Sequence, residues 1–132
     1  MLNTLKNQNV ALKHKIYLQA RAMDEVNNGI MITDANGTIV YTNRYVTEIS
    51  GYNSDELIGK NPRILKSNRQ NTTFYKQLWD TISHGKKWSG IIINKRKDGT
   101  CWSEQLMITP ITNEDGVIEY YISIQELLKK KA

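Results

Sequence analysis

The amino-acid sequence predicts an α+β domain built on a five-stranded antiparallel sheet. Two β-rich runs flank the turn Asp34-Ala35-Asn36-Gly37, and an Asn-Gly pair in this setting is a strong hairpin signal. Three further strand-forming runs follow residue 87, and Gly-containing turns separate them. Helical patterns occupy the segment between the two groups of strands, so we expect helices to cover one face of the sheet.

The composition is that of one soluble globular domain. The chain has 132 residues, enough for a single core, and 39% of them are hydrophobic. No apolar run approaches the roughly 20 residues that span a bilayer, and Lys6 interrupts the apolar residues near Met1. Cys101 is the only cysteine, which favours a reducing, cytoplasmic location.

The formal net charge of +5 makes nucleic acid a partner to consider, because basic patches neutralise phosphates. The basic residues are spread along the chain, however, and acidic residues lie between them. No aromatic and basic residues combine in a nucleic-acid signature. We therefore expect no direct contact with nucleic acid and no membrane segment in this chain.

Residues 1–27 are predicted to form an amphipathic helix before the first strand. Six of the eight seam positions of a heptad repeat are apolar there, which is typical of a short coiled coil. These positions are Leu2, Leu5, Leu12, Ile16, Met23 and Val26. Asn9 and Gln19 interrupt the seam, although an asparagine at position a can fix the register. The helix either joins two copies in a homodimer or packs on its own domain, and Gly29 is expected to end it.

The domain itself is predicted to cover residues 28–125. Its expected elements are strands at 30–33 and 38–41, short helices at 44–50 and 55–57, a loop at 59–70, a helix at 73–83, and strands at 88–95, 102–111 and 117–125. Asn43, Ser54 and either Asn71 or Thr72 are expected to cap the helices. Residues 126–132 are expected to begin as a helix and then break into three lysines, as a truncated connector.

The chemistry of the side chains favours binding over catalysis. The helix at 73–83 has an apolar and aromatic face, and Asn94 follows the apolar run Ile91-Ile92-Ile93. An apolar wall with a few placed polar groups is how a planar cofactor is held. No nucleophile lies beside a base and no metal-ligand spacing occurs, so we expect a sensor module and not an enzyme.

Several short motifs resemble the PAS sensor-domain family over residues 20–125. They are Asp34-Ala35-Asn36-Gly37, Asn43, Gly51-Tyr52, Glu56-Leu57-Ile58-Gly59-Lys60, Trp88-Ser89-Gly90, Arg96-Lys97-Asp98-Gly99 and Tyr120-Tyr121-Ile122. Each motif alone is weak, but their order and spacing together are specific. The resemblance implies a sheet with strand order 2-1-5-4-3, which agrees with the five strands expected above.

Within this family the chain is most similar to the flavin-binding redox and oxygen sensors of bacteria, of the nitrogen-fixation sensor and aerotaxis receptor type. It is also similar to light-oxygen-voltage (LOV) domains, whose loop matching Gly59–Leu65 bears a reactive cysteine. Pro62 occupies the place of that cysteine, so a light-driven flavin-cysteinyl adduct is not expected. The resemblance implies FAD as the cofactor, with FMN or no cofactor as alternatives.

Four site residues follow from the resemblance on the helix and strands. Asn94 matches a strand amide that hydrogen-bonds the flavin pyrimidine edge, and Gln125 matches a glutamine near flavin N5. Trp79 matches a tryptophan beside the flavin, and Trp88 is typical of these sensors. The alternatives are that Asn94 points to solvent, that Gln125 is an ordinary strand-end residue, and that both tryptophans only pack.

The loop and the fourth strand supply four further candidates. Asn61 and Arg63 are expected to hold ribityl or phosphate groups, and Lys66 adds positive charge. Lys66 and Glu104 depart from the photoreceptor pattern, which has amides at both positions. Glu104 is expected either to accept a hydrogen bond from the flavin or a water, or to be a surface carboxylate. The alternative for the basic residues is an ordinary solvated loop.

Haem is the other cofactor to weigh, because a histidine near the long helix is a common axial ligand. His84 lies there, but Gly85 and two lysines follow it as at an ordinary helix C-terminus, so haem is not expected. The sequence thus predicts a sensor that reports redox state or oxygen to a missing C-terminal effector, such as a kinase, a cyclase or a chemoreceptor. The alternative is a ligand-free or small-metabolite-binding dimerisation and relay module.

Overall fold

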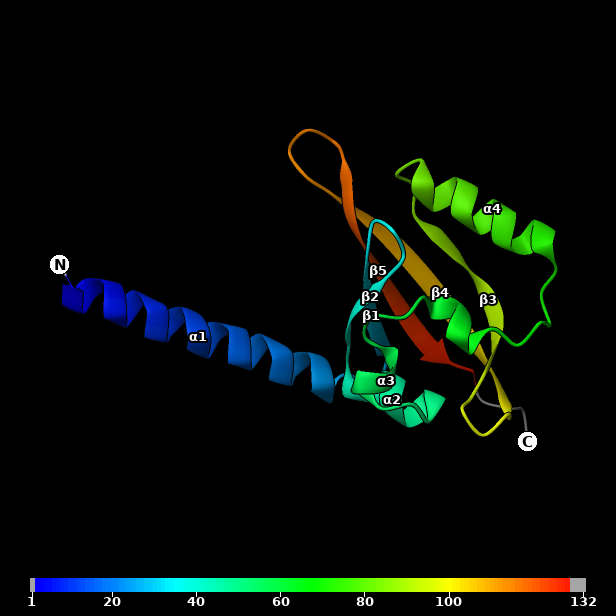
Figure 1. Cartoon of the computed structure of the whole chain (residues 1–132), viewed down its shortest axis with the longest axis horizontal. Coiled ribbons are helices and arrows are strands. Elements are labelled where there is room, and N and C mark those ends of the chain that lie inside the picture. Colours follow the sequence, from blue (N-terminus) through cyan, green and yellow to red (C-terminus); the bar gives the residue numbers. More distant parts are fainter. Residues whose placement is uncertain (1, 129–132) are drawn as a thin grey trace.

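A five-stranded antiparallel sheet organises residues 2–128, the part of the chain that the computed structural model describes. The strand order is β2-β1-β5-β4-β3, which confirms the predicted α+β fold (Figure 1). The elements are α1 (Leu2–Glu25), β1 (Gly29–Asp34), β2 (Ile39–Thr42), α2 (Arg44–Ser50), α3 (Ser54–Leu57), the 3-10 helix η1 (Pro62–Leu65), α4 (Thr72–Ser83), β3 (Trp88–Lys95), β4 (Cys101–Thr112) and β5 (Ile118–Leu127).

The central strand of the sheet is β5, which pairs with β1 on one side and β4 on the other. Gln125 of β5 lies opposite Gly29 of β1 and opposite Leu106 of β4. The first strand of the domain therefore pairs with the last one, and this pairing joins the β2-β1 hairpin to β4 and β3 in one sheet.

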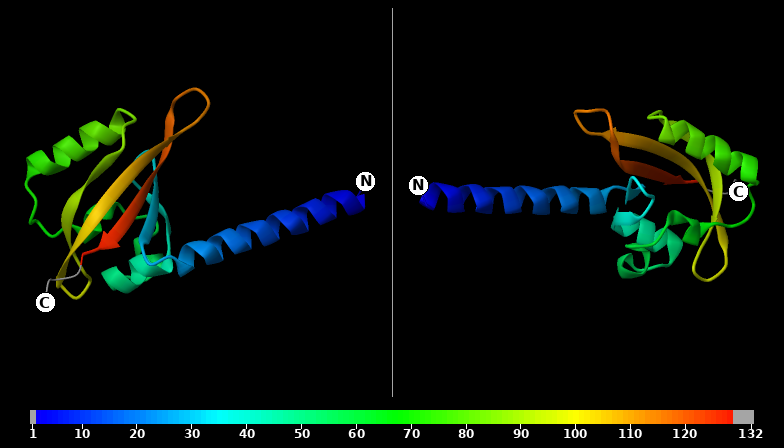
Figure 2. Two further views of the ribbon diagram at one scale, coloured as in Figure 1. Left: turned by 180° about the vertical axis from the view of Figure 1, so that it is seen from behind. Right: turned by 45° about the horizontal axis from the view of Figure 1, so that its top comes forward.

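The helices α2, α3, η1 and α4 all lie on one face of the sheet, as expected (Figures 1 and 2). Strand side chains alternate between the two faces, so every second residue packs toward these helices. One buried cluster joins α2 and α3 to β1 and includes Val46, Leu57 and Met31. A second cluster joins α4 to β3 and β4 and includes Leu78 and Leu106.

Asn43 joins three elements through a buried side chain that is 1% exposed. Its Nδ2 donates to the carbonyls of Met23 and Asn28, both at 2.9 Å. Its Oδ1 accepts from the backbone N–H of Ile30 at 2.9 Å and of Val46 at 3.3 Å. The predicted cap of α2 is confirmed, and the same side chain also holds the end of α1 and the start of β1.

The other caps follow the prediction except in α3. Asn71 Oδ1 accepts a hydrogen bond from the Phe74 N–H at 2.9 Å and caps α4. The cap of α3 is Asn53 and not Ser54, so that prediction was wrong by one residue. The reason is Glu56, whose Oε1 accepts a hydrogen bond from the Asn53 N–H at 3.1 Å.

Three other local predictions are corrected. Gly29 does not end α1, which stops at Glu25; Gly29 begins β1, because its backbone pairs with Gln125. Residues 126–127 do not begin a helix, because they extend β5 and pair with β4. Within the expected loop, Pro62 starts the 3-10 helix η1, a position that needs no backbone donor. The three predicted connector lysines lie outside the described residues.

Helix α1 extends away from the domain (Figures 1 and 2). None of its residues is buried, so the expectation that it packs on its own domain is wrong. Its use as a dimer contact stays a prediction.

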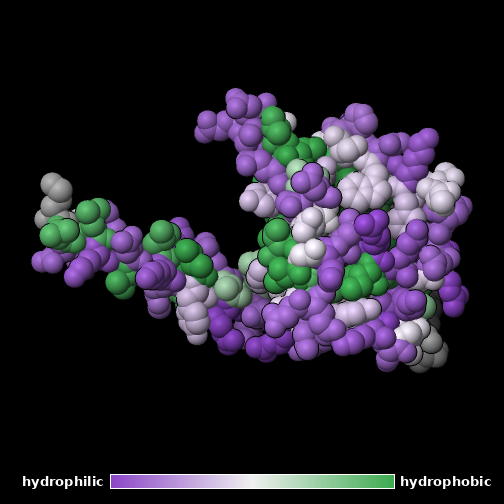
Figure 3. All heavy atoms as spheres, viewed as in Figure 1, coloured by the Kyte–Doolittle hydropathy of each residue, from purple (hydrophilic) through white to green (hydrophobic). Residues whose placement is uncertain are grey.

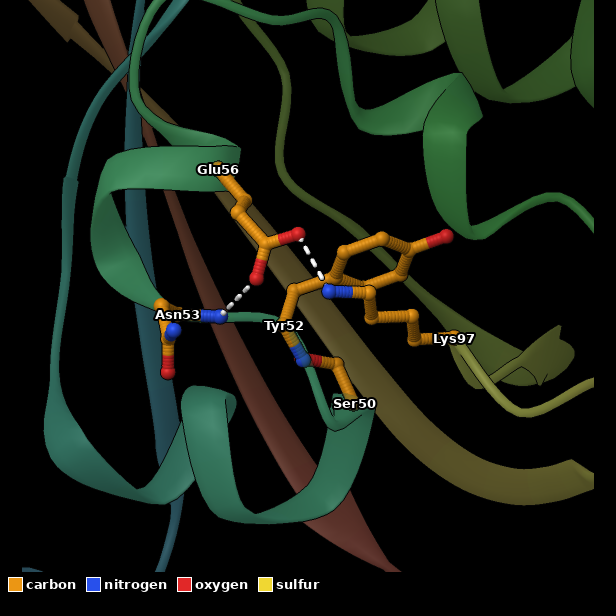
Figure 4. A network of polar contacts seen from close by, with 5 residues as sticks. All are labelled: Ser50, Tyr52, Asn53, Glu56 and Lys97. Carbon is orange, nitrogen blue, oxygen red and sulfur yellow. Dashed lines mark hydrogen bonds and ion pairs between the residues drawn. The ribbon is translucent and has the colours of Figure 1, made fainter.

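The β3–β4 turn is fastened to the corner between α2 and α3 (Figure 4). Lys97 Nζ lies 2.6 Å from Glu56 Oε2, and the Lys97 N–H donates to the Ser50 carbonyl at 2.9 Å. Arg96 Nε donates to the Ile49 carbonyl at 2.8 Å. Hydrogen bonds to backbone carbonyls therefore hold the turn against the short helices. The exposed ion pair between Lys97 and Glu56 contributes little to stability.

We expect Asn43→Ala to lower the free energy of unfolding by about 3 kcal/mol, because it leaves buried backbone groups without partners. Asn71→Ala is the matched control: it removes an exposed cap of the same residue type and is expected to cost about 1 kcal/mol. Urea unfolding followed by circular dichroism measures both values. Equal losses in the two variants would contradict the role given to Asn43.

Candidate functional site

A cavity of about 320 Å³ lies between the inner face of the sheet, α4 and η1. This volume is within the range of sites that bind small molecules. Six of the eight predicted site residues line the cavity, and Trp88 and Glu104 do not. The six are Asn61, Arg63, Lys66, Trp79, Asn94 and Gln125.

Apolar side chains from α4 and from the sheet form the walls of the cavity. They are Leu78 and Ile82 on α4, Ile92 on β3, and Leu106 and Ile108 on β4. Trp79 has its ring edge-on to Tyr121, with centroids 6.2 Å apart and an interplanar angle of 88°. Because Trp79 is 41% exposed, it borders the opening of the cavity and is not an ordinary core residue.

Two amide side chains supply polarity to this apolar cavity. Asn94 is 8% exposed and Gln125 is 4% exposed, so neither points to solvent. The alternative that Gln125 ends its strand is also wrong, because β5 continues to Leu127. Among the described residues, Gln125 Oε1 is buried and has no hydrogen-bond partner. An orphaned amide oxygen at a cavity is costly, and a ligand with a suitable donor would satisfy it.

Glu104 lies behind Asn94 and is fully buried, so it is not a surface carboxylate. Asn94 Nδ2 donates to Glu104 Oε1 at 2.5 Å, whereas Oε2 finds no partner within the part of the chain described. Burial raises the pKa of Glu104 to about 7, although the Asn94 amide and the Trp102 indole act in the opposite direction. The carboxyl group can therefore gain or lose a proton near neutral pH.

The segment around η1 brings positive charge to the opening of the cavity. Arg63 and Lys66 line the cavity with exposed side chains, and Lys66 Nζ lies 4.7 Å from the centre of the Tyr75 ring. Asn61 Oδ1 accepts from the Arg63 N–H at 3.0 Å and so caps η1. The backbone of Lys66 forms an isolated bridge with Asn94, which anchors the segment to β3.

Two residues considered at the sequence level lie elsewhere. Trp88 packs edge-on against Phe74, and its Nε1 donates to Gln77 Oε1 at 2.8 Å, so it belongs to the core beside the cavity. His84 is exposed at the end of α4, where its Nδ1 contacts the Asp80 carbonyl. It does not line the cavity.

Sequence reasoning missed several residues that line the cavity, among them Thr33, Tyr121 and Ser123. The alternation of β5 would have found two of them, because Tyr121 and Ser123 share a face with Gln125. Thr33 required knowledge that β1 lies beside β5, a pairing that no local pattern reveals.

The described residues hold no group of three side chains suited to a metal ion. Neither α1 nor any other helix in residues 2–128 has the length and apolar character needed to cross a bilayer.

Comparison with known proteins shows that the domain containing this cavity matches a known family. The model of the PAS domain family matches residues 27–126, which includes the whole of the predicted domain, residues 28–125. The chain is 32% identical over 103 residues to a nitrogen fixation regulatory protein of Klebsiella oxytoca, covering 78% of this chain and 21% of the relative. It is 33% identical over 111 residues to a bacterioopsin transcriptional activator of Halobacterium salinarum, covering 82% of this chain and 16% of the relative.

Solved structures show the same architecture. The LOV domain of the blue-light photoreceptor Aureochrome1 superposes with a TM-score of 0.72 and 26% identity, covering 77% of this chain and 82% of that one. The chain spans about a fifth or less of the length of the two curated relatives. The similarity therefore concerns a sensory domain within longer signalling proteins.

We expect the stability of the protein to fall as pH rises from about 4.5 to about 7, by about 3 kcal/mol in total. In that interval the folded state keeps the Glu104 proton that the unfolded state has released. Urea unfolding at pH 5, 6, 7 and 8 measures the slope. Glu104→Gln should flatten this part of the profile, whereas Glu126→Gln, at an exposed position, should leave it unchanged. A Glu104→Gln protein with the wild-type slope would contradict the assignment.

Proposed function

Because the chain belongs to the PAS domain family, we propose that it is a sensory domain that binds FAD in its cavity and reports redox state or oxygen to an effector. The observation that best supports a bound flavin is the buried, unpartnered Oε1 of Gln125 at an otherwise apolar cavity. The buried pair of Asn94 and Glu104 beside it adds a donor, an acceptor and a titrating proton.

The amides suit a flat ring whose edge alternates carbonyl and N–H groups. Asn94 and Gln125 each combine a donor and an acceptor, and they project from β3 and β5 into the same cavity. Trp79 offers a flat face near the opening. A bound flavin would supply a redox centre that takes up a proton on reduction.

Glu104 is suited to follow such a change in protonation. Its pKa of about 7 means that a small change in nearby charge shifts the occupancy of its proton. Asn94 is its hydrogen-bond donor and also lines the cavity, so Asn94 connects the carboxyl group to the ligand. Gln125 can rotate its amide to present either a donor or an acceptor.

A chain of contacts connects Gln125 to the end of α1. A Cβ added to Gly29 would lie 3.0 Å from Gln125 Oε1, so the Gln125 side chain packs tightly on the start of β1. Asn43 holds the Ile30 N–H together with the Met23 carbonyl of α1. A rotation of Gln125 would therefore press on the junction that sets the direction of α1, the kind of two-state element that signalling needs.

The choice between FAD and FMN depends on the opening of the cavity. Arg63 and Lys66 place two cations there, which suits the diphosphate of FAD. FMN, with one phosphate, is the alternative occupant. Pro62 also lines the cavity and has no thiol, so we propose redox sensing in place of adduct photochemistry.

A second candidate is a dimerisation and relay module that binds a small metabolite or nothing. The exposed apolar seam of α1 favours a homodimer through this helix and the PAS domain in either case. We propose that the domain is non-catalytic and acts on an effector such as a kinase, a cyclase or a chemoreceptor. The single exposed Cys101 suits a reducing, cytoplasmic setting.

The absorption spectrum of the purified full chain, before and after dithionite, tests the cofactor. We expect two broad flavin bands that bleach on reduction. Gln125→Leu should weaken FAD binding about 10-fold, because a buried hydrogen bond is lost. Gln105→Leu, on the opposite face of the sheet, is the matched control and should bind as the wild type does. A featureless spectrum that persists after incubation with FAD and with FMN would leave the relay module as the better account.

A further inference from the structure

Residues 59–70, which we call the strap, cross the helix-bearing face of the sheet from one edge to the other. At one end the Ile39 N–H of β2 donates to the Lys60 carbonyl at 2.8 Å. At the other end an isolated bridge joins Lys66 to Asn94 of β3, the opposite edge strand. Four strand spacings separate these edges, so the strap spans about 19 Å. Because both edge strands hold it, the strap has a fixed backbone over the cavity that η1 lines.

Every third residue of the strap from Lys60 onward is an exposed cation. Lys60, Arg63, Lys66 and Arg69 form this set, which we call the basic row. Most residues between them are partly or fully buried, and Leu65 is 2% exposed. In η1 the Lys66 N–H donates to the Arg63 carbonyl at 2.9 Å, and residues three apart in a 3-10 helix lie on the same side. Figure 3 shows hydrophilic side chains around the place of η1, between α3 and α4.

The described residues do not neutralise the basic row. No aspartate or glutamate occurs between residues 57 and 79. The ion pairs found in residues 2–128 join Arg21 to Glu25 and Lys97 to Glu56, so none of them includes the basic row. Like charges held on one fixed backbone repel each other, and an anionic partner would remove this repulsion.

The ligand proposed for the cavity would use only half of the basic row. Arg63 and Lys66 line the opening of the cavity, where phosphate groups would reach them. Lys60 and Arg69, at the two ends of the row, do not line the cavity. The complete row therefore suits an anion that is longer than a diphosphate and follows the strap.

The spacing of the basic row matches one side of an α-helix. Three residues of a 3-10 helix rise about 6 Å, and four residues of an α-helix rise the same distance. Carboxylates at every fourth position of a partner helix would therefore meet successive cations at η1. Ile58, 45% exposed and just before the strap, offers an apolar contact beside these charges. Arginine beside apolar surface is typical of contacts between proteins.

Two other sources of negative charge fit the strap less well. Residues 57–70 contain no aromatic side chain, on which the bases of single-stranded nucleic acid would stack. A second copy of this chain would not supply the helix, because no helix within residues 2–128 carries two acidic residues one turn apart. The chemistry therefore favours a different protein as the partner.

We propose that the basic row docks an acidic α-helix of a partner protein, whose carboxylates lie one turn apart. Arg63 and Lys66 then serve two anions, the carboxylates of the partner and the phosphates of a ligand at the cavity opening. A cation that holds one anion attracts a second one less strongly, so ligand and partner compete. Each lowers the affinity for the other by the same factor. The competition rests on the proposed flavin, whereas docking on the basic row does not.

Fluorescence anisotropy on the full chain tests the docking surface. The probe is a fluorescein-labelled helical peptide of repeated Glu-Ala-Ala-Ala units with blocked ends. We expect it to bind, and Lys60→Gln with Arg69→Gln should weaken binding about 10-fold. Lys86→Gln with Lys87→Gln removes the same charge at exposed positions after α4 and should leave the affinity unchanged.

Three results would overturn the docking surface. The first is no binding of the peptide even at low ionic strength, and the second is an equal loss in both double variants, which would mean that only net charge matters. The third is tighter binding of duplex DNA or single-stranded RNA that the Lys60 and Arg69 substitutions abolish, because the row would then be a nucleic-acid site.

Loading the cavity tests the competition separately. The same peptide is titrated into protein saturated with riboflavin, FMN or FAD, which carry no, one and two phosphates. We expect its affinity to fall in that order, about 3-fold for each phosphate. Equal affinities in the three samples would overturn the competition. A protein that binds none of these flavins would overturn the proposed cofactor together with the competition, whereas peptide binding that depends on Lys60 and Arg69 would still support the basic row.

Discussion

The insertion of β5 between β1 and β4 is the interaction on which the rest of the structure depends. It joins the last described strand to the first one, so the sheet is complete only when both ends of the domain have come together. Alternation along β5 then divides its side chains between two surfaces. Tyr121, Ser123 and Gln125 face the cavity, whereas Ile122 and Ile124 lie on the side of the sheet that carries no helix. The central strand of the sheet thus lines the cavity with one set of its side chains and forms the middle of the helix-free face with the other.

The cavity departs from the usual composition of a core. A buried carboxyl and two buried amides cost free energy, because desolvation is only partly repaid by the single bond between Asn94 and Glu104. The surrounding apolar clusters under α2 and α4 stabilise the domain enough to tolerate that cost. In natural proteins, buried polar groups without partners are expected mainly at functional sites. The unpartnered Gln125 oxygen and the titrating Glu104 mark this place in the chain.

The Asn43 side chain gives the projecting helix a defined direction. Without it, the short segment between α1 and β1 would allow many orientations. With it, the ends of α1 and the starts of β1 and α2 share one buried hydrogen-bonded junction. The tight contact between Gly29 and Gln125 lies directly beside that junction. The cavity residue Gln125 and the end of α1 are therefore close in space, although they are far apart in sequence.

Local chemistry allowed much of the fold to be predicted. The Asn-Gly hairpin, the Asn43 and Asn71 caps and the alternating strands depend on interactions between residues close in sequence, so the α+β class and the five strands could be deduced. The motifs then indicated the strand order. The local sequence pattern gave wrong predictions at Gly29 and at residues 126–127. Pairing with distant strands places Gly29 in β1 and residues 126–127 in β5, although the pattern predicted the end of one helix and the start of another.

The sequence alone also determined most of the candidate site: its amides, its basic loop and the proline where LOV domains have a cysteine. Only the tertiary structure decided which of these residues meet. It brought Asn94 and Gln125 to one cavity, moved Trp88 outside it and buried Glu104 completely. It also separated α1 from its own domain. The physical reason is that cavity lining, burial and pKa are set by neighbours on other strands and helices, and those neighbours are chosen by the pairing of β5 and not by any local pattern.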